Sequence, residues 1–205
     1  TLVGRVLKEG LSAPDFKVVS GDLKEASLAD FSGKIKIITT FPSLDTPVCD
    51  LQVKEFNRRA SGLSSQVLVV AVSKDLPFAQ KRFCQEHDIN NIKVLSDYKF
   101  SSFGINYGLL IKELNLLARS VWILDKNDTI RFIQIVSELT SPPDYEAVLN
   151  KLQEVIKNPA IAIEEGLPAK CKPCETGVGA LPKEAADKLI AKYHGWQVVE
   201  DKKIV

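Results

Sequence analysis

Runs of β-branched and aliphatic residues alternate with helical patterns over residues 1–158 of the chain. Four largely apolar runs are typical of buried strands: Ile35–Phe41, Val67–Ser73, Arg119–Asp125 and Thr129–Val136. Apolar residues at helical spacing predict three helices that pack on these strands: Pro47–Ala60, Leu76–His87 and Asp144–Lys157. The alternation of strands and helices predicts an α/β domain with a central sheet flanked by helices.

The sheet is expected to be mixed, because the last two strands flank the turn-forming run Lys126-Asn127-Asp128. Turn residues between two alternating apolar runs are typical of an antiparallel hairpin. Near the start of the chain, Phe16-Lys17-Val18-Val19 stands among Gly and Asp turn signals, which favours a strand or hairpin at the edge of the domain. Trp122 lies inside a predicted strand and is expected in the core.

The composition changes at Asn158-Pro159, which predicts three parts of unequal size. Residues 1–158 form the main domain, residues 159–169 a linker, and residues 170–205 a small C-terminal extension too short to bury much surface by itself. In this extension we expect a short helix over Pro182–Tyr193, followed by a strand around Val198-Val199.

Charge and hydropathy exclude several classes of partner. The 27 Lys and Arg against 26 Asp and Glu leave a net charge of +1, which argues against binding to nucleic acid or to an anionic membrane. The longest apolar runs are far shorter than the roughly 20 residues that span a bilayer. Since no basic and apolar leader is visible, we expect a cytoplasmic protein.

The four cysteines are too few for a secreted scaffold held together by disulfides. They are therefore candidates for reactive or metal-binding thiols. Cys49 follows a strand, and it falls in the first turn of a helix for which Thr46 is the predicted N-cap and Pro47 the first residue. Free backbone N–H groups and the helix dipole there favour a thiolate over a thiol. The spacing alone equally fits a small core residue on a stripe with Val53 and Phe56.

The motifs around Cys49 resemble those of a known family. Pro42, Thr46 and Cys49 stand in the Pro-x-x-x-Thr-x-x-Cys pattern of the peroxiredoxins. The string from Pro42 to Cys49 and the string Asp-Leu-Pro-Phe-Ala-Gln-Lys-Arg-Phe-Cys from Asp75 to Cys84 resemble the bacterial thiol peroxidases. The similarity extends over nearly all of residues 1–158. It implies a thioredoxin-like fold for that domain.

The resemblance implies a role for each matching residue. Cys49 would be the peroxidatic cysteine, which attacks the O–O bond of a hydroperoxide and becomes a sulfenic acid. Thr46 would hydrogen-bond the thiolate and the peroxide, Pro42 would shield the pocket from water, and Arg119 would hold the sulfur anionic and polarise the peroxide. Taken singly, Thr46 could be only a cap, Pro42 only a strand terminator and Arg119 only a surface charge.

By the same resemblance, Cys84 would be the resolving cysteine, forming an intramolecular disulfide with Cys49. The residues three and four positions from Cys84 in its helix are polar, which predicts a place at the polar edge of the helix. Two thiols on separate helices are rarely within disulfide reach, so we expect local unwinding during turnover. A thioredoxin-like protein would reduce the disulfide, with no flavin, haem or metal as cofactor.

The C-terminal extension carries further motifs. Cys171-Lys172-Pro173-Cys174 is a Cys-x-x-Cys motif, which fits a redox-active pair, half of a zinc site or a plain loop. A zinc site would need two further ligands, and the spacing of His87 and His194 matches no common zinc pattern. We therefore expect no metal site. Leu181-Pro182-Lys183-Glu184 and Gly195-Trp196-Gln197-Val198-Val199 resemble the N-terminal part of pterin carbinolamine dehydratases. The histidine-rich active-site segment of that family has no counterpart here.

The resemblance therefore implies a thioredoxin-dependent peroxidase that acts on hydrogen peroxide and alkyl hydroperoxides and forms a homodimer. Two alternatives remain open at this point. One is a scaffold in which a decayed peroxidase domain supports a dehydratase-like dimer module. The other is a disulfide exchanger that uses Cys171 and Cys174.

Overall fold

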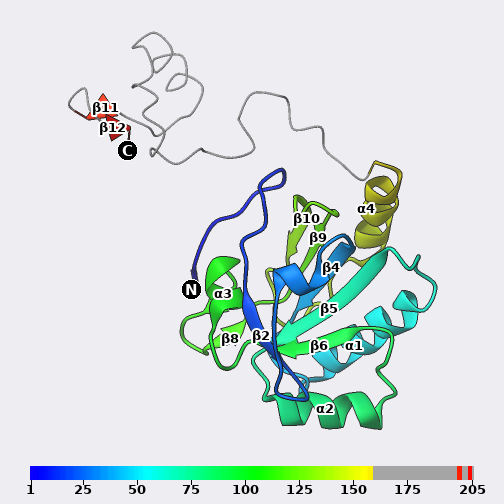
Figure 1. Cartoon of the computed structure of the whole chain (residues 1–205). Coiled ribbons are helices and arrows are strands. Elements are labelled where there is room, and N and C mark those ends of the chain that lie inside the picture. Colours follow the sequence, from blue (N-terminus) through cyan, green and yellow to red (C-terminus); the bar gives the residue numbers. More distant parts are fainter. Residues whose placement is uncertain (159–197, 200–202, 205) are drawn as a thin grey trace. The chain divides into compact units, whose positions relative to one another are not determined.

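The computed structural model describes residues 1–158, 198–199 and 203–204 (Figure 1). The chain divides into two units, Thr1–Ala162 and Ile163–Val205. In the second unit, β11 (Val198–Val199) pairs antiparallel with β12 (Lys203–Ile204). The predicted linker at 159–169, the helix at Pro182–Tyr193 and the pair Cys171 and Cys174 lie outside the described residues.

Within residues 1–158, a seven-stranded sheet has the order β10-β9-β4-β5-β6-β2-β3. β4, β5 and β6 are parallel, and the remaining neighbours are antiparallel. The strands are β2 (Lys17–Ser20), β3 (Glu25–Ser27), β4 (Ile35–Thr40), β5 (Val67–Ser73), β6 (Lys93–Ser96), β9 (Ser120–Leu124) and β10 (Ile130–Ile135). The expected mixed sheet is confirmed, as are the β9–β10 hairpin and the edge hairpin of β2 and β3.

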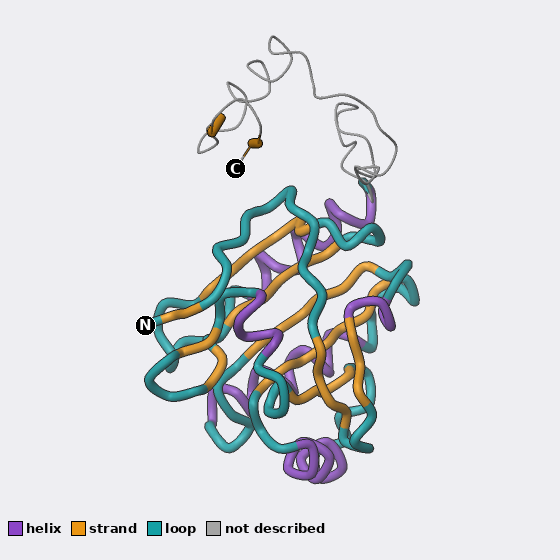
Figure 2. Tube along the Cα trace, turned by 60° about the vertical axis from the view of Figure 1, so that its left-hand side comes forward, coloured by secondary structure: helices purple, strands orange, loops and turns teal. Residues whose placement is uncertain are grey.

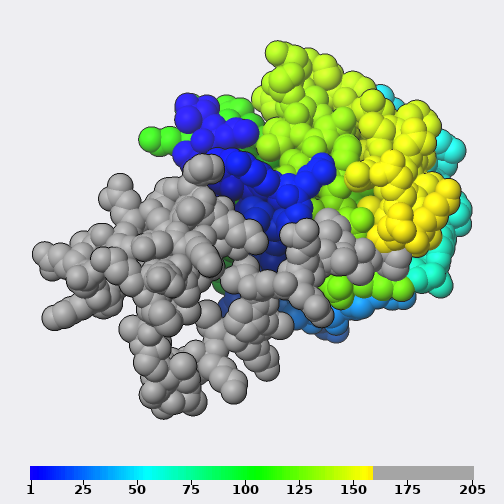
Figure 3. Space-filling model, turned by 90° about the horizontal axis from the view of Figure 1, so that it is seen from above, coloured from blue at the N-terminus to red at the C-terminus, as the bar shows by residue number. Residues whose placement is uncertain are grey.

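The helices are α1 (Pro47–Ala60), α2 (Pro77–Glu86), α3 (Ser102–Asn106) and α4 (Tyr145–Lys157), with a 3₁₀ turn η1 at Leu28–Phe31. A small second sheet joins β1 (Leu2–Val3), β7 (Leu110–Ile111) and β8 (Leu116–Leu117). Helices lie on both sides of the large sheet (Figure 2). Seen from above, α4 in yellow and β10 in yellow-green lie next to each other on the surface of the domain (Figure 3).

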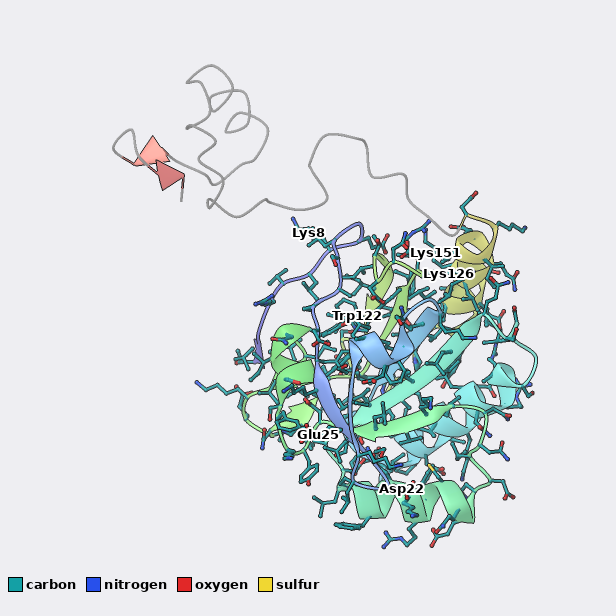
Figure 4. All side chains as sticks on the ribbon, in the orientation of Figure 1. Lys8, Asp22, Glu25, Trp122, Lys126 and Lys151 are labelled. Atoms are coloured by element: carbon teal, nitrogen blue, oxygen red, sulfur yellow. The ribbon has the colours of Figure 1, made fainter. Side chains whose placement is uncertain are left out.

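Two apolar clusters cover the two faces of the central strands. In β9, Val121 and Ile123 pack with α1 and α4, whereas Trp122 and Leu124 pack with α3 and the N-terminal segments. Successive side chains of a strand point to opposite faces, so burial on both faces requires the nearly continuous apolar runs seen in the sequence. Trp122 lies inside the domain as predicted, whereas Lys126 lies toward its periphery (Figure 4).

The observed elements differ from the predicted ones mainly at their ends. The bounds of β5 and α1 are those predicted, whereas β4 ends at Thr40 and β9 begins at Ser120, one residue inside the predicted range. Arg119 therefore precedes the strand to which its sequence pattern assigned it. The short elements β6 and α3 were not predicted.

Candidate active site

Cys49 lies in the first turn of α1 and is fully buried. Thr46 is the N-cap residue and Pro47 the first helical residue, as the sequence predicts. Cys49 also belongs to the apolar stripe of α1, together with Val53 and Phe56. Cys49 is therefore both a first-turn thiol and a core residue of the helix, because the apolar stripe of α1 faces the sheet.

The pairing of β4 with β9 brings Arg119 to Cys49. β4 runs antiparallel to β9 with Thr40 opposite Ser120, so the residue before β9 lies at the end of the sheet where β4 leads into α1. The pairing at this end is reinforced by Thr40, whose hydroxyl lies 2.6 Å from both the Ala118 carbonyl oxygen and the Ser120 hydroxyl. Residues 70 positions apart in the chain are therefore held at one place by the sheet register.

Arg119 is 1% exposed and contacts the sulfur directly. Its Nη2 donates to Cys49 Sγ at 3.4 Å and to the Leu139 carbonyl oxygen at 2.7 Å. Its Nη1 donates to Gln52 Oε1. The interpretation of Arg119 as a surface charge is therefore wrong, because the guanidinium is buried against the thiol.

Gln52 is a residue of this site that the sequence interpretation missed. It lies one helical turn after Cys49 and is fully buried. Its Nε2 donates to Thr39 Oγ1 at 2.6 Å and to the Thr40 carbonyl oxygen at 3.2 Å, which leaves Oε1 to accept from Arg119. The signal that could have revealed it is an amide on the otherwise apolar stripe of α1.

The charge of Arg119 has no carboxylate partner within ion-pair distance in the described part of the chain. A cation removed from water is costly unless an anion or several hydrogen-bond acceptors compensate it. Gln52 and Leu139 supply neutral oxygens, and Cys49 is the one group in contact with the guanidinium that can become an anion. A negative charge formed at this sulfur would therefore lie directly against the guanidinium.

Thr46 and Pro42 lie in the loop that leads into α1. Pro42 is buried, and Thr46 is exposed. The Thr46 hydroxyl donates to the Ser43 carbonyl oxygen at 3.1 Å, and it makes no hydrogen bond with the Cys49 sulfur in the described structure. The expected contact of Thr46 with thiolate and peroxide stays a prediction for the state with bound peroxide.

Cys84 lies in the last turn of α2 and is partly buried against the cluster that contains Cys49. Burial raises the pKa of its thiol above the ordinary value. Both cysteines are free thiols in this structure. The turn between β2 and β3 contacts α2 through the ion pair of Asp22 and Lys81, whose charged atoms are 2.7 Å apart; Figure 4 shows Asp22 beside that helix.

A cavity of about 370 Å³ separates the start of α1 from α2. Thr46 and Pro47 line it from the start of α1, Asp75 from the loop before α2, and Ala79 and Phe83 from α2 itself. Neither Cys49 nor Cys84 is among the residues that line the cavity. In this conformation, α1 and α2 both line the cavity, and their two cysteines lie outside its lining.

Two absences apply to the residues described here. None of their helices is long and apolar enough to cross a membrane. Among these same residues, no group of three or more His, Cys, Asp and Glu side chains could hold a metal ion.

Comparison with known proteins gives the following similarities. The redoxin family matches residues 8–149. The thiol peroxidases of Oceanobacillus iheyensis and Bacillus subtilis are each 46% identical to the chain, over 154 and 157 residues, which is 75% and 77% of this chain and 93% of each relative. The crystal structure of a peroxiredoxin-like protein from Aquifex aeolicus has 43% identity and a TM-score of 0.71, with 76% of this chain and 91% of that chain covered. These similarities confirm the expected thioredoxin-like fold.

Proposed function

The chain belongs to the thiol peroxidases, a group of peroxiredoxin enzymes within the redoxin family, and on this basis we propose that it reduces hydrogen peroxide and alkyl hydroperoxides at Cys49. The observation that carries the proposal is the buried contact of Arg119 with the Cys49 sulfur. A nucleophilic thiol needs to be ionised at neutral pH, and a buried guanidinium without a carboxylate partner favours that state.

The first step is attack of the Cys49 thiolate on the terminal oxygen of the hydroperoxide. An S–O bond forms and the O–O bond breaks, so the sulfur is oxidised to a sulfenic acid and the leaving oxygen takes a proton to become water or an alcohol. Negative charge passes from the sulfur to the leaving oxygen during this step. Arg119 stabilises both positions, and Thr46 donates to the peroxide while Pro42 keeps water out.

The second step joins the two cysteines. The Cys84 thiol attacks the sulfenic acid, an S–S bond forms, and the oxygen leaves as water. Cys49 is fully buried, and the two thiols are free and lie on separate helices, so we expect the disulfide to form with local unwinding of one or both helices. A thioredoxin-like dithiol then reduces the disulfide and restores both thiols.

The proposal is tested by counting thiols in reduced protein treated with one equivalent of hydrogen peroxide. We expect two thiols to be lost, assigned by peptide mass spectrometry to a disulfide of Cys49 and Cys84. Cys49→Ser should consume no peroxide, and thioredoxin with its reductase should sustain turnover of the unchanged protein only. A decayed peroxidase domain predicts no thiol loss, and an exchanger based on Cys171 and Cys174 predicts disulfide reduction that survives Cys49→Ser.

The proposal extends to the cytoplasm as the compartment and to a homodimer as the assembly. Sedimentation of the reduced full chain at several concentrations tests the homodimer. The division into a peroxidase domain at 1–158, a linker at 159–169 and a dehydratase-like extension at 170–205 also remains a proposal. Limited proteolysis should cut first within the linker if this division is right.

A further inference from the structure

One carboxylate joins the loop that leads to Cys49 with the loop that leads to the helix of Cys84. Asp75 Oδ1 accepts from the Ser43 hydroxyl at 2.6 Å, and Asp75 Oδ2 accepts from the Leu44 backbone N–H at 2.9 Å. Ser43 and Leu44 precede α1, whereas Asp75 stands between β5 and α2. The contact therefore spans the two segments that a disulfide would have to rearrange.

Asp75 is itself held in place by hydrogen bonds to neighbouring strands and, through Ser73, to α2. The Ser73 hydroxyl donates to Asp75 Oδ2 at 2.7 Å and accepts from Gln80 Nε2 at 2.9 Å. The Ser96 hydroxyl donates to the backbone carbonyl of Asp75. Through these bonds the carboxylate is anchored to the ends of β5 and β6 and to the first turns of α2. The loop before α1 is thus held against a rigid support.

The bound loop also sets the geometry of the helix cap. The Ser43 carbonyl oxygen accepts from both the hydroxyl and the backbone N–H of Thr46, at 3.1 and 3.2 Å. The Thr46 carbonyl oxygen in turn accepts from the Asp50 N–H at 3.0 Å, which closes the first turn of α1 around Cys49. A change in the position of Ser43 therefore moves the cap and the first turn of the helix.

We propose that Asp75 is a positioning residue that latches the loop at Ser43 and Leu44 in the conformation that reacts with peroxide, and so restrains formation of the disulfide. This inference rests on the proposed function. Asp75 touches neither sulfur; it acts through the loop. Its three bonds with Ser43, Leu44 and Ser73 are charge-assisted, and such bonds are stronger than those between neutral groups.

The latch makes the two steps respond in opposite directions. While the carboxylate holds the loop, Thr46 and the first turn of α1 stay in place for the attack on peroxide. The loop must come free before the first turn of α1, which carries Cys49, can unwind; Leu44 of this loop and Asp75 both line the cavity between α1 and α2. Weakening the latch should therefore slow the peroxide step and accelerate the disulfide step. A residue with a merely structural role would slow both.

The test compares the Asp75→Asn variant with the unchanged full chain. Asparagine keeps one acceptor oxygen, but its NH₂ group cannot accept from Leu44 or Ser73. Rapid mixing of reduced protein with hydrogen peroxide gives the first rate from peroxide loss and the second from loss of dimedone-reactive sulfenic acid. We expect the first rate to fall and the second to rise, each by at least about tenfold, because two charge-assisted hydrogen bonds are lost.

Asp125→Asn is the matched control. Asp125 is a buried carboxylate that accepts from the backbone N–H groups of Asn127 and Thr129, at 2.9 and 3.0 Å, in the β9–β10 hairpin. Its loss should destabilise the hairpin without separating the two rates. Ser43→Ala, which removes one of the three donors to Asp75, should move both rates in the same directions as Asp75→Asn by a smaller factor.

Amide hydrogen exchange of the reduced proteins gives a second measurement that needs no peroxide. Asp75→Asn should accelerate exchange in residues 43–52 and 76–86, and Asp125→Asn in residues 125–131. Two rates that fall together, or an exchange pattern shared by both variants, would overturn the latch. Absence of the disulfide in the unchanged chain would contradict the proposed function instead, and the exchange pattern would still decide the role of Asp75.

Discussion

The two thiols that the proposed reaction needs lie in contrasting surroundings. Cys49 is fully buried, and it contacts a guanidinium that has no carboxylate partner within the described part of the chain. Cys84 is partly exposed, makes no hydrogen bond through its sulfur in the same part, and has a pKa raised by burial. The two buried surroundings thus differ: at Cys49 the sulfur contacts a cation, whereas at Cys84 burial without a cation favours the neutral thiol.

This contrast suits a reaction whose two cysteines act in turn. The first thiol needs to be reactive in the resting protein, whereas the second needs to react only after the first is oxidised. A thiol that stays protonated in the folded helix is a slow nucleophile and is protected from oxidation. The difference in environment therefore enforces the order of the steps. The predictions below test each side of the contrast, from the largest expected effect to the smallest.

Arg119→Gln should have the largest effect, because it removes the charge that distinguishes the two sites. We expect the rate of peroxide loss in a single turnover to fall by about 10²–10³, the usual cost of removing one donor to a developing charge. Arg119→Lys keeps the charge but lacks the planar guanidinium that reaches Cys49, Gln52 and Leu139 together. Its rate should therefore lie between those of the unchanged protein and of Arg119→Gln. Stopped-flow measurement of both variants decides the matter, and an unchanged rate in Arg119→Gln would contradict the electrostatic argument.

Gln52→Ala should have a smaller effect on the same step, because Gln52 orients the guanidinium without touching the sulfur. Loss of its oxygen leaves Nη1 of Arg119 without its partner, and we expect the rate to fall about tenfold, the cost of one buried bond to a charged group. Gln52→Glu keeps an acceptor for Arg119 but adds the carboxylate partner that the guanidinium lacks, so it should slow the step further by competing with the Cys49 sulfur for the charge. A faster rate in Gln52→Glu than in Gln52→Ala would contradict the argument that the charge of Arg119 acts on the sulfur.

The framework of this site follows largely from the sequence. The bounds of α1 and β5 were predicted because a Thr-Pro start and an unbroken apolar run are local signals. β6 was missed because only two of its four residues, Lys93–Ser96, are apolar, and its pairing with β5 and β2 is what makes it a strand.

The contacts within the site were less predictable. Cys49, Arg119 and Thr46 were named through the resemblance, but the pairing of β4 with β9 is what buries Arg119 against the sulfur. The roles of Gln52 and Asp75 depend on residues that are distant in the chain or in another loop. Sequence periodicity indicates which face of a helix is buried, and it carries no information about the polar group that a buried amide meets there.

The pH dependence of the second step should be steeper than that of the first. Because burial raises the pKa of Cys84, its thiolate is a small fraction at neutral pH and grows about tenfold for each pH unit below that pKa. Disulfide formation should therefore accelerate between about pH 6 and 8, and more steeply than peroxide loss at Cys49, whose sulfur contacts Arg119. Both rates come from one quenched-flow series, and parallel slopes would remove the distinction between the two thiols.

Cys84→Ser should have the smallest effect on the first step. The Cys84 sulfur takes no part in the contacts of Arg119, so peroxide loss in a single turnover should stay within about twofold of the unchanged protein, less than the cost of any lost hydrogen bond. The serine side chain is close to the cysteine in volume, and a partly exposed position accommodates its hydroxyl. With thioredoxin as reductant the variant should complete one turnover and stop, leaving Cys49 as a sulfenic acid that dimedone labels. A first turnover slowed as much as in Gln52→Ala would mean that the helix of Cys84 takes part in activating Cys49, and the two regions would then have to be treated as a single site.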